Sequence, residues 1–480
     1  MHKPHAVCLP FPAQGHINPM MQLAKLLHSR GFYITFVNTE FVKDRLALFH
    51  GTQFSNGFED FRMESIADGL APEFDRVSDL ATLLDASRKY WLNPFRELVL
   101  KLNQTAGIPK VRCIVSEWVL NFSKVVADEI GVPRASLITN SASSCWGYLQ
   151  IPDLIQRGII PFKDESLIHD KGYLDTTVDW IPGMPNIRLR DLPTFIRTTN
   201  LHDFIVQYCK VECQEALRSS ALILNTFYEL EKEVLNAVKA SFLCPMYALG
   251  PLISFSNHES KDQLKNTSMS LWNQESECLD WLEKQKPRSV LFVSFGSMTI
   301  VTPQELNEFA WGLANCLTPF IWIIREDLVK GEGAILSEEF TRETKERGFI
   351  ARWCDQARVL SHASVGGFFT HCGWNSCMES ICHGVPMICW PVFADQQMNC
   401  RYICQEWGIG MEIEGEVNRE KVEALVKALM NGEKSREMRL KAMEWKDGSE
   451  RAVQIGGSSY LDFEKLMNEV LLKGQPMDES

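Results

Sequence analysis

Short apolar segments alternate with stretches of helical periodicity along most of this chain. Residues 6–11 are apolar, residues 19–29 repeat apolar side chains at helical spacing, and residues 32–37 are β-branched and aromatic. Gly31 directly follows the helical stretch, at the position where a left-handed residue commonly ends a helix. A second strand, helix and strand follow at residues 113–138. Because parallel strands are joined by crossover helices, this rhythm predicts a doubly wound parallel α/β fold.

The same rhythm restarts after a polar stretch at residues 254–270, whose composition is typical of a linker. Residues 289–295 are again apolar, and Thr302, Pro303 and Glu305 have the spacing of a capping box with proline at the first helical position. Further short strands are expected at residues 320–324, 349–351, 365–370 and 386–390. Since 480 residues exceed what one compact core usually holds, we predict domains at 1–252 and 275–455, a linker at 253–274, and a C-terminal helix and tail at 456–480.

The balance of charge and the cysteine usage limit the class of protein. The chain has 49 Lys and Arg against 61 Asp and Glu, a formal net charge of -12, so its surface field repels nucleic acid and anionic lipid. No run reaches the roughly 18 apolar residues that a membrane span needs, and residues 1–12 lack the pattern of a secretory signal. The 15 cysteines are odd in number and scattered, as reduced core thiols are. We therefore expect a cytoplasmic protein with no nucleic acid partner and no membrane insertion.

The loop after the expected strand at 365–370 has the character of an anion site. In doubly wound folds ligands bind beyond the carboxyl ends of the strands. There His371 leads into a helix whose first turn holds Asn375 and Ser376, and its free backbone N–H groups suit a diphosphate. Glu379 lies one turn further on the same face, where it could accept hydrogen bonds from ribose hydroxyls. The alternative from these residues alone is that Asn375 and Ser376 cap the helix and Trp374 belongs to the core.

A longer pattern surrounds this loop. The segment from Trp353 to Gln396 reads WCDQARVLSHASVGGFFTHCGWNSCMESICHGVPMICWPVFADQ. It resembles, almost position for position, the nucleotide-sugar signature of plant secondary-product UDP-glycosyltransferases. Residues 10–20 (PFPAQGHINPM), 172–184, 295–297 and 456–459 extend the resemblance over the whole chain. It is closest to the subgroup that glucosylates cyanohydrins, iridoids and other terpenoid alcohols, with some members acting on flavonoids.

The resemblance implies a GT-B fold, in which two Rossmann-like domains face a cleft and the C-terminal helix returns to the first domain. The N-terminal domain would bind the acceptor, and the C-terminal domain would bind the UDP-sugar. Carried over by position, the resemblance implies that Trp353 stacks on uracil and that Gln356 and Glu379 hold the ribose. It implies that the diphosphate is held by His371, Asn375, Ser376 and Ser297, and the sugar by Trp374, Asp395 and Gln396. Cys354 and Gly373, which lie within the same signature, are also expected to be UDP-sugar-binding residues. A glutamine at the end of the signature usually accompanies glucose. UDP-glucose is therefore the expected donor, although Thr139 in the first domain would also influence the choice, and xylose, rhamnose and glucuronate stay open.

His16 is the candidate general base, because it follows the first strand and precedes a helix that we expect to begin near Pro19. An alcohol is a poor nucleophile, and an imidazole, with an ordinary pKa of about 6.5, suits the removal of its proton. The alternative is a histidine that caps the helix, a role that Asn18 could fill instead. Relatives place an aspartate beside this histidine, whereas this chain has Glu117 there; Asp128 is a weak substitute. The resemblance implies inverting transfer to give a β-glucoside.

Neither a metal nor a cofactor is expected, with UDP-glucose serving as co-substrate. The helix N-terminus, His371 and Ser297 would stabilise the charge on the leaving diphosphate. A zinc site is disfavoured because the spacing of the nearby His and Cys residues matches no usual ligand frame; these residues are His362, His371, Cys372, Cys377, Cys382 and His383.

The acceptor is expected to be a small lipophilic alcohol or phenol, and the protein is expected to be a monomer. The acceptor would meet Trp118, residues 141–146, and loops near 85–95 and 186–192, although core packing explains the same apolar residues equally well. Two other functions were weighed. A nucleotide-sugar epimerase could share the fold and the diphosphate site, and a catalytically silent UDP-sugar-binding protein is conceivable because of Glu117.

Overall fold

A computed structural model of the chain describes residues 3–51, 58–71, 74, 76, 79–259, 264, 269–329 and 336–473. The chain forms two compact units. Unit 1 comprises Met1–Leu189, Phe195–Leu271 and Arg451–Ser480, and unit 2 comprises Arg190–Thr194 and Trp272–Glu450. Among the described residues, no helix combines the length and the apolar character that crossing a bilayer would take.

Unit 1 is built on a seven-stranded parallel sheet with the order β3-β2-β1-β4-β5-β6-β7. Its strands are β1 (His5–Leu9), β2 (Tyr33–Thr39), β3 (Phe61–Ile66), β4 (Val111–Glu117), β5 (Arg134–Ile138), β6 (Ala221–Leu224) and β7 (Met246–Ala248). The chain starts at β1, winds out to β3, and then crosses back to β4 on the other side of β1. The carboxyl ends of β1 and β4 therefore form the point where the strand order reverses, which is the usual ligand position in such sheets.

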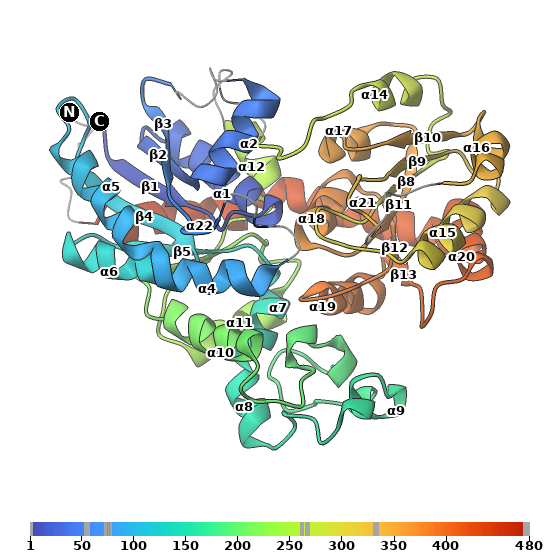
Figure 1. The fold of residues 1–480 in the computed structure, drawn as a ribbon, viewed down its shortest axis with the longest axis horizontal. Helices are drawn as coiled ribbons and strands as arrows, with labels where there is room; N and C mark the ends of the chain where they lie inside the picture. The colour runs from blue at the N-terminus through green and yellow to red at the C-terminus, as the bar shows by residue number, and fades with distance from the viewer. Residues whose placement is uncertain are drawn as a thin grey trace. The chain divides into compact units, whose positions relative to one another are not determined.

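The helices of unit 1 connect these strands (Figure 1). They are α1 (Gln14–Ser29), α2 (Glu40–His50), α4 (Leu80–Tyr90), α5 (Leu92–Gln104), α6 (Phe122–Glu129), α7 (Ala142–Leu149), α8 (Ile151–Gln156), α9 (Lys171–Leu174), α10 (Phe204–Ala216), α11 (Lys232–Ser241), α12 (Leu252–Glu259) and α22 (Ser458–Leu466). The last helix returns to the first sheet, where Asp462 accepts a hydrogen bond from the backbone N–H of Ala248 in β7 (3.0 Å). The expected return of the C-terminal helix is confirmed.

Three local expectations for unit 1 are wrong. Helix α1 begins at Gln14 rather than near Pro19, because the N–H groups of His16 and Ile17 already donate to the carbonyl oxygen of Ala13 (2.9 Å each). Pro19 removes only its own hydrogen bond, which does not prevent the helix from forming. The first part of the expected linker is helix α12, because Phe255 finds an apolar partner in Phe463 of α22 (ring centroids 5.6 Å apart). Residues 85–95 lie in α4 and α5 rather than in a loop.

Unit 2 contains a six-stranded parallel sheet with the order β10-β9-β8-β11-β12-β13. The strands are β8 (Val290–Ser294), β9 (Phe320–Ile323), β10 (Gly348–Ala351), β11 (Val365–Thr370), β12 (Met387–Cys389) and β13 (Gly410–Glu412). The helices are α14 (Glu277–Leu282), α15 (Pro303–Asn315), α16 (Glu338–Thr344), α17 (Gln356–Ser361), α18 (Trp374–His383), α19 (Gln396–Arg401), α20 (Arg419–Asn431) and α21 (Glu433–Val453). The capping box is confirmed at the start of α15, where the Thr302 hydroxyl accepts from the N–H of Glu305 and the Glu305 carboxylate accepts from the N–H of Thr302. The doubly wound α/β prediction is confirmed for both units.

Candidate active site

His16 lies in the first turn of α1, next to two polar side chains from distant parts of the chain. Its Nδ1 is 2.9 Å from the Thr139 hydroxyl and 3.3 Å from a carboxylate oxygen of Glu117. The Thr139 hydroxyl donates to the other Glu117 oxygen (3.0 Å). Glu117 is fully buried, whereas about a third (33%) of the His16 side chain is exposed. The His16 imidazole therefore has one nitrogen held by buried polar groups.

The sheet of unit 1 explains why these three residues meet. Strand β1 is flanked by β4, and β4 is flanked by β5, with Leu9 opposite Ser116 and Glu117 opposite Leu137. Glu117 ends β4, Thr139 directly follows β5, and His16 lies just beyond β1. Because the strands are parallel, all three residues come to the same edge of the sheet. The expected approach of Glu117 to His16 is present in the structure.

Arg134 is a buried cation behind this group that the sequence analysis missed. Its guanidinium donates to the Ser116 hydroxyl (2.9 Å), to the Asn121 side chain (2.8 Å) and to the backbone carbonyl of Glu117 (3.0 Å). Burial lowers the pKa of Arg134 to about 10, so the side chain remains charged at neutral pH. Arg134 thus holds the segment that carries Glu117. An arginine at the first position of a strand was the available signal, but its pairing depends on strand order.

The first turn of α18 in unit 2 has no side-chain cap. The N-cap residue is Gly373, which has no side chain to bond the first backbone N–H groups. Asn375 and Ser376 occupy later positions of the first turn, so the interpretation of these two residues as N-caps is wrong. Trp374 is buried and its ring lies against Trp407 (centroids 6.2 Å apart), which supports the core interpretation for its indole. Trp374 therefore contributes its backbone, and not its indole, to the first turn of α18.

Gln356, the first residue of α17, connects this helix to Ser376 and Glu379 of α18. Its side-chain amide donates to the Ser376 hydroxyl (2.8 Å) and to the Glu379 carboxylate (2.7 Å). Burial, with a smaller contribution from the negative charge of Asp355, raises the pKa of Glu379 to about 7, against the lowering effect of the Gln356 hydrogen bond. The structure therefore brings together the two residues expected to hold ribose.

His371 fills the space between two neighbouring loops. Strands β8 and β11 are adjacent, so Gly296 and Ser297 after β8 lie beside the loop after β11. A Cβ atom placed on Gly296 would be 2.4 Å from His371 Nε2, and one on Gly373 would be 2.5 Å from the same atom. Both glycines are therefore required for the imidazole to fit. This packing joins the two loops expected to contact the diphosphate.

Arg325 is a second buried cation that the sequence analysis missed. It donates to the backbone carbonyls of Gly296 and Thr299 and forms an ion pair with Asp327 (2.9 Å). Burial, followed by the positive charge of Arg325, lowers the pKa of His371 to about 3. His371 is therefore neutral at physiological pH, and the positive charge at this edge of the sheet comes from Arg325.

Trp353 has an aromatic neighbour that the signature does not include. Trp272 stacks on it, with ring centroids 4.6 Å apart and an angle of 26° between the planes. A base can therefore stack on Trp353 only at the face that Trp272 leaves uncovered. Cys354, the next residue, is buried, and a hydrogen bond with the Cys278 thiol, followed by burial, raises the pKa of its thiol well above the ordinary value.

Asp395 and Gln396 begin α19 and are tied to the surrounding loops. The side-chain oxygen of Gln396 accepts from the N–H groups of Val392 and Phe393 (2.8 and 3.1 Å), so the group it can offer a sugar is its amide N–H. Asn399 donates to Asp395 (3.0 Å) and to the carbonyl of Cys372 (3.0 Å), which connects α19 to the loop after β11.

The segment Arg190–Thr194 belongs to unit 2 and supports the same region. The N–H of Thr194 donates to the carbonyl of Ala394 (2.9 Å), and the N–H of Ala394 donates to the Thr194 hydroxyl (2.8 Å). Two backbone-directed bonds thus hold the residue before Asp395. Nothing in the local sequence indicates this long-range pairing.

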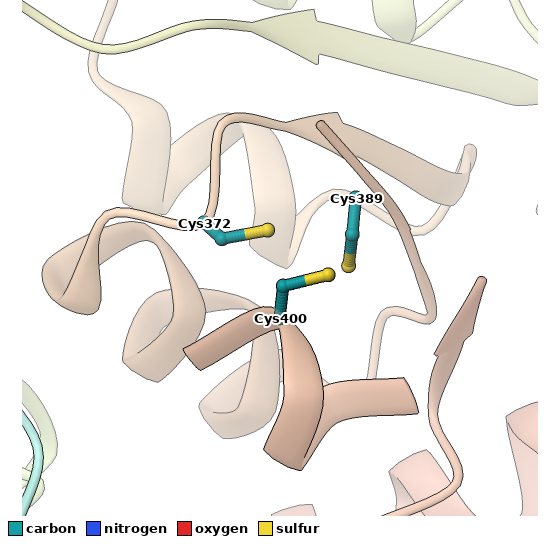
Figure 2. A group of neighbouring side chains, drawn as sticks. All are labelled: Cys372, Cys389 and Cys400. Atoms are coloured by element: carbon teal, nitrogen blue, oxygen red, sulfur yellow. The ribbon is translucent and has the colours of Figure 1, made fainter. Parts of the chain in front are cut away.

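Three cysteine side chains point toward one another behind the loop after β11 (Figure 2). The sulfur atoms of Cys372, Cys389 and Cys400 lie within 4.8 Å of one another. Of the residues weighed from the sequence as zinc ligands, only Cys372 belongs to this group. Burial raises the pKa of the Cys372 and Cys389 thiols well above the ordinary value, and a metal ligand must be a thiolate. The arrangement therefore fits packed neutral thiols better than a metal centre.

Two aromatic residues expected to line the acceptor site are buried. Trp118 and Trp146 are each about 5% exposed or less, and the indole N–H of Trp146 donates to the carbonyl of Pro182 (2.9 Å). Their burial agrees with the alternative that these residues pack the core of unit 1.

Comparisons with known proteins cover almost the whole chain. A family model described as UDP-glucoronosyl and UDP-glucosyl transferase matches residues 13–449. The 7-deoxyloganetin glucosyltransferase of Gardenia jasminoides is 51% identical over 476 residues, covering 98% of each chain. The (R)-mandelonitrile beta-glucosyltransferase of Prunus dulcis is 49% identical over 473 residues, again covering 98% of each.

Solved structures share the fold. Os79 from O. sativa in complex with UDP matches with a TM-score of 0.79 at 26% identity, over 96% of this chain and 99% of that one. Phytolacca americana UGT2, solved with UDP-2fluoro-glucose and pterostilbene, matches with a TM-score of 0.79 at 26% identity, over 97% and 99% of the two chains. These matches confirm the expected GT-B fold.

Proposed function

The chain belongs to the family of UDP-glucoronosyl and UDP-glucosyl transferases, and we propose that it transfers glucose from UDP-glucose to a hydroxyl group of a small lipophilic acceptor, with inversion at the anomeric carbon. It is a UDP-glucosyltransferase, as its relatives are. The observation that carries the proposed mechanism is the arrangement of His16, Thr139 and Glu117. One imidazole nitrogen faces buried polar groups, which leaves Nε2 to act on a substrate.

In the proposed reaction, His16 Nε2 takes the proton of the acceptor hydroxyl as its oxygen attacks the anomeric carbon. The bond between that carbon and the UDP oxygen breaks on the opposite face, and a β-O-glucoside and UDP result. The carboxylate of Glu117 stabilises the imidazolium that forms, as a carboxylate does beside a catalytic histidine. This role needs the carboxylate close to Nδ1, and the 3.3 Å separation provides that.

We assign the donor to unit 2. The backbone N–H groups in the first turn of α18 would bind the diphosphate. Ser297 and the neutral His371 would donate further hydrogen bonds to it, and Arg325 would supply positive charge. Gln356 and Glu379 would bind the ribose, one face of Trp353 would stack on uracil, and Asp395 with the Gln396 amide would bind the glucose. Because Arg325 would place a positive charge near the diphosphate, we expect transfer without a metal ion, which EDTA treatment of the purified protein tests.

The acceptor class is proposed from the relatives, whose names specify 7-deoxyloganetin and (R)-mandelonitrile. An iridoid alcohol or a cyanohydrin is therefore the first choice, and a flavonoid is the second. We also propose a monomeric, cytoplasmic protein, since the reaction needs no group from a second copy.

The test is product analysis with the full chain, UDP-glucose and a panel of 7-deoxyloganetin, mandelonitrile and a flavonol. A new β-glucoside, identified by mass and by anomeric coupling in NMR, is expected with at least one acceptor and is expected to disappear in His16→Ala. Binding of UDP-glucose without any glucoside would indicate a silent UDP-sugar-binding protein. A changed UDP-sugar in the absence of acceptor would indicate an epimerase.

A further inference from the structure

The Thr139 hydroxyl lies between His16 and Glu117 and contacts both more closely than they contact each other. It is 2.9 Å from His16 Nδ1 and 3.0 Å from Glu117 Oε1, whereas Nδ1 and Glu117 Oε2 are 3.3 Å apart. Thr139 is 7% exposed and follows β5 directly. The side chain therefore forms a bridge rather than a contact at the surface.

The direction of these hydrogen bonds decides the state of the imidazole. A hydroxyl has one proton to donate, and Thr139 donates it to Glu117. Its oxygen can then only accept from His16, so the Nδ1 of His16 carries a proton and Nε2 carries the lone pair. The reverse arrangement would leave a carboxylate oxygen of Glu117 facing a hydroxyl oxygen with no proton between them, and a buried acceptor without a donor is costly.

We propose that Thr139 is a positioning residue of the glucosyl transfer: its hydroxyl connects Glu117 to His16 and holds the imidazole in the tautomer that can accept the acceptor's proton. This inference rests on the proposed function, in which His16 is the base. It gives Thr139 a role different from the sugar contact expected from the resemblance, because its only proton is already donated to Glu117.

The bridge also accounts for glutamate at this position. The side chain of Glu117 is one methylene longer than the aspartate of relatives. Its Oε1 accepts the hydrogen bond of the Thr139 hydroxyl, whereas its Oε2 lies 3.3 Å from His16 Nδ1 without forming a hydrogen bond. Arg134 holds the backbone carbonyl of Glu117 from behind (3.0 Å), which limits how far the carboxylate can retract.

The experiment compares two acceptors that share a 4-nitrophenyl ring, 4-nitrobenzyl alcohol and 4-nitrophenol. The alcohol needs a base, whereas the phenol is largely ionised near pH 8 and needs little help. We expect Thr139→Val to lower kcat with the alcohol by roughly 10- to 100-fold, which is at or below the lower end of the roughly 100- to 10,000-fold that general base catalysis contributes, because Thr139 acts only through His16. We expect a change of less than about threefold with the phenol, and Thr139→Ser should restore the alcohol reaction.

The controls separate this role from a structural one and from the proposed function. Thr344→Val removes another buried hydroxyl, bonded to the Phe340 carbonyl in α16, and should change neither reaction. An equal loss with both acceptors in Thr139→Val, or no loss with either, would overturn the inference. If neither acceptor is glucosylated by the wild type, the proposed function fails. If His16→Ala lowers both reactions equally, the assignment of His16 as the base fails. If His16→Ala lowers only the alcohol reaction and Thr139→Val does not, only the role of Thr139 fails.

Discussion

Replacing Glu117 by glutamine tests the electrostatic part of the mechanism, because it removes the charge and keeps the shape of the side chain. One oxygen of Glu117 lies 3.3 Å from His16 Nδ1. Two unit charges at that separation interact by about 5 kcal/mol at an effective dielectric constant of about 20. Since 33% of the His16 side chain is exposed, water screens this attraction. We take about half of it, roughly 2 to 3 kcal/mol, as the stabilisation of the imidazolium.

This free energy corresponds to a fall in kcat of roughly 30- to 150-fold for an alcohol acceptor in Glu117→Gln. The assay is the initial rate of UDP release at saturating UDP-glucose, with the affinity for UDP measured separately by calorimetry. UDP affinity should not change, because Glu117 lies in unit 1 and the proposed diphosphate site lies in unit 2. Glu215→Gln is the matched control. It makes the same chemical change at a partly exposed glutamate that forms an ion pair with Arg218, and it should leave kcat unchanged. A kcat within threefold of the wild-type value would refute the assignment of Glu117 as the partner of His16.

Three further predictions concern unit 2. The pKa of Glu379 is raised to about 7, so its charged form is disfavoured in the folded state, and the free energy of unfolding should fall as pH rises from about 4.5 to about 7. We expect this fall to be about 2 to 3 kcal/mol and to be absent in Glu379→Gln. The variant should therefore show a smaller difference in Tm between pH 5 and pH 8 than the wild type. Gly296→Ala should lower stability by about 1 to 3 kcal/mol and abolish UDP binding in calorimetry, because its Cβ would overlap the His371 ring and its φ of +73° disfavours alanine. Arg325→Gln should weaken UDP binding by about tenfold or more in the same assay, with Arg325→Lys between it and the wild type, because the buried charge is lost.

Much of the secondary structure can be predicted from local patterns in the sequence. The alternation of apolar strands and amphipathic helices identified both doubly wound sheets, and the spacing of Thr302, Pro303 and Glu305 placed the start of α15 correctly. Two of the three local errors, those at α1 and α12, have a common cause. Pro19 and the polar residues after Ser254 indicate breaks when considered alone, but hydrogen bonds to Ala13 and the contact of Phe255 with Phe463 outweigh those local preferences.

The residues of the candidate site also fall into two groups, those that the local sequence predicts and those that only the fold brings together. The loop after the strand at 365–370, with Asn375 and Ser376 in the helix that follows, could be proposed as an anion site because a strand end and a helix start are local features. The approach of Glu117 to His16 was expected from the resemblance, but the hydrogen bonds of Thr139 to both residues could not be found. These three residues are far apart in sequence and meet only because β1, β4 and β5 lie side by side.

The buried cations show the same limit most clearly. Arg134 and Arg325 look like ordinary charged residues at strand ends, and nothing near them in the chain indicates which carbonyl groups they hold. Hydrophobic periodicity reports which face of an element is buried, and it carries no information on which strands become neighbours. Strand order and register therefore decide which polar groups share one buried site, and only the folded chain supplies them.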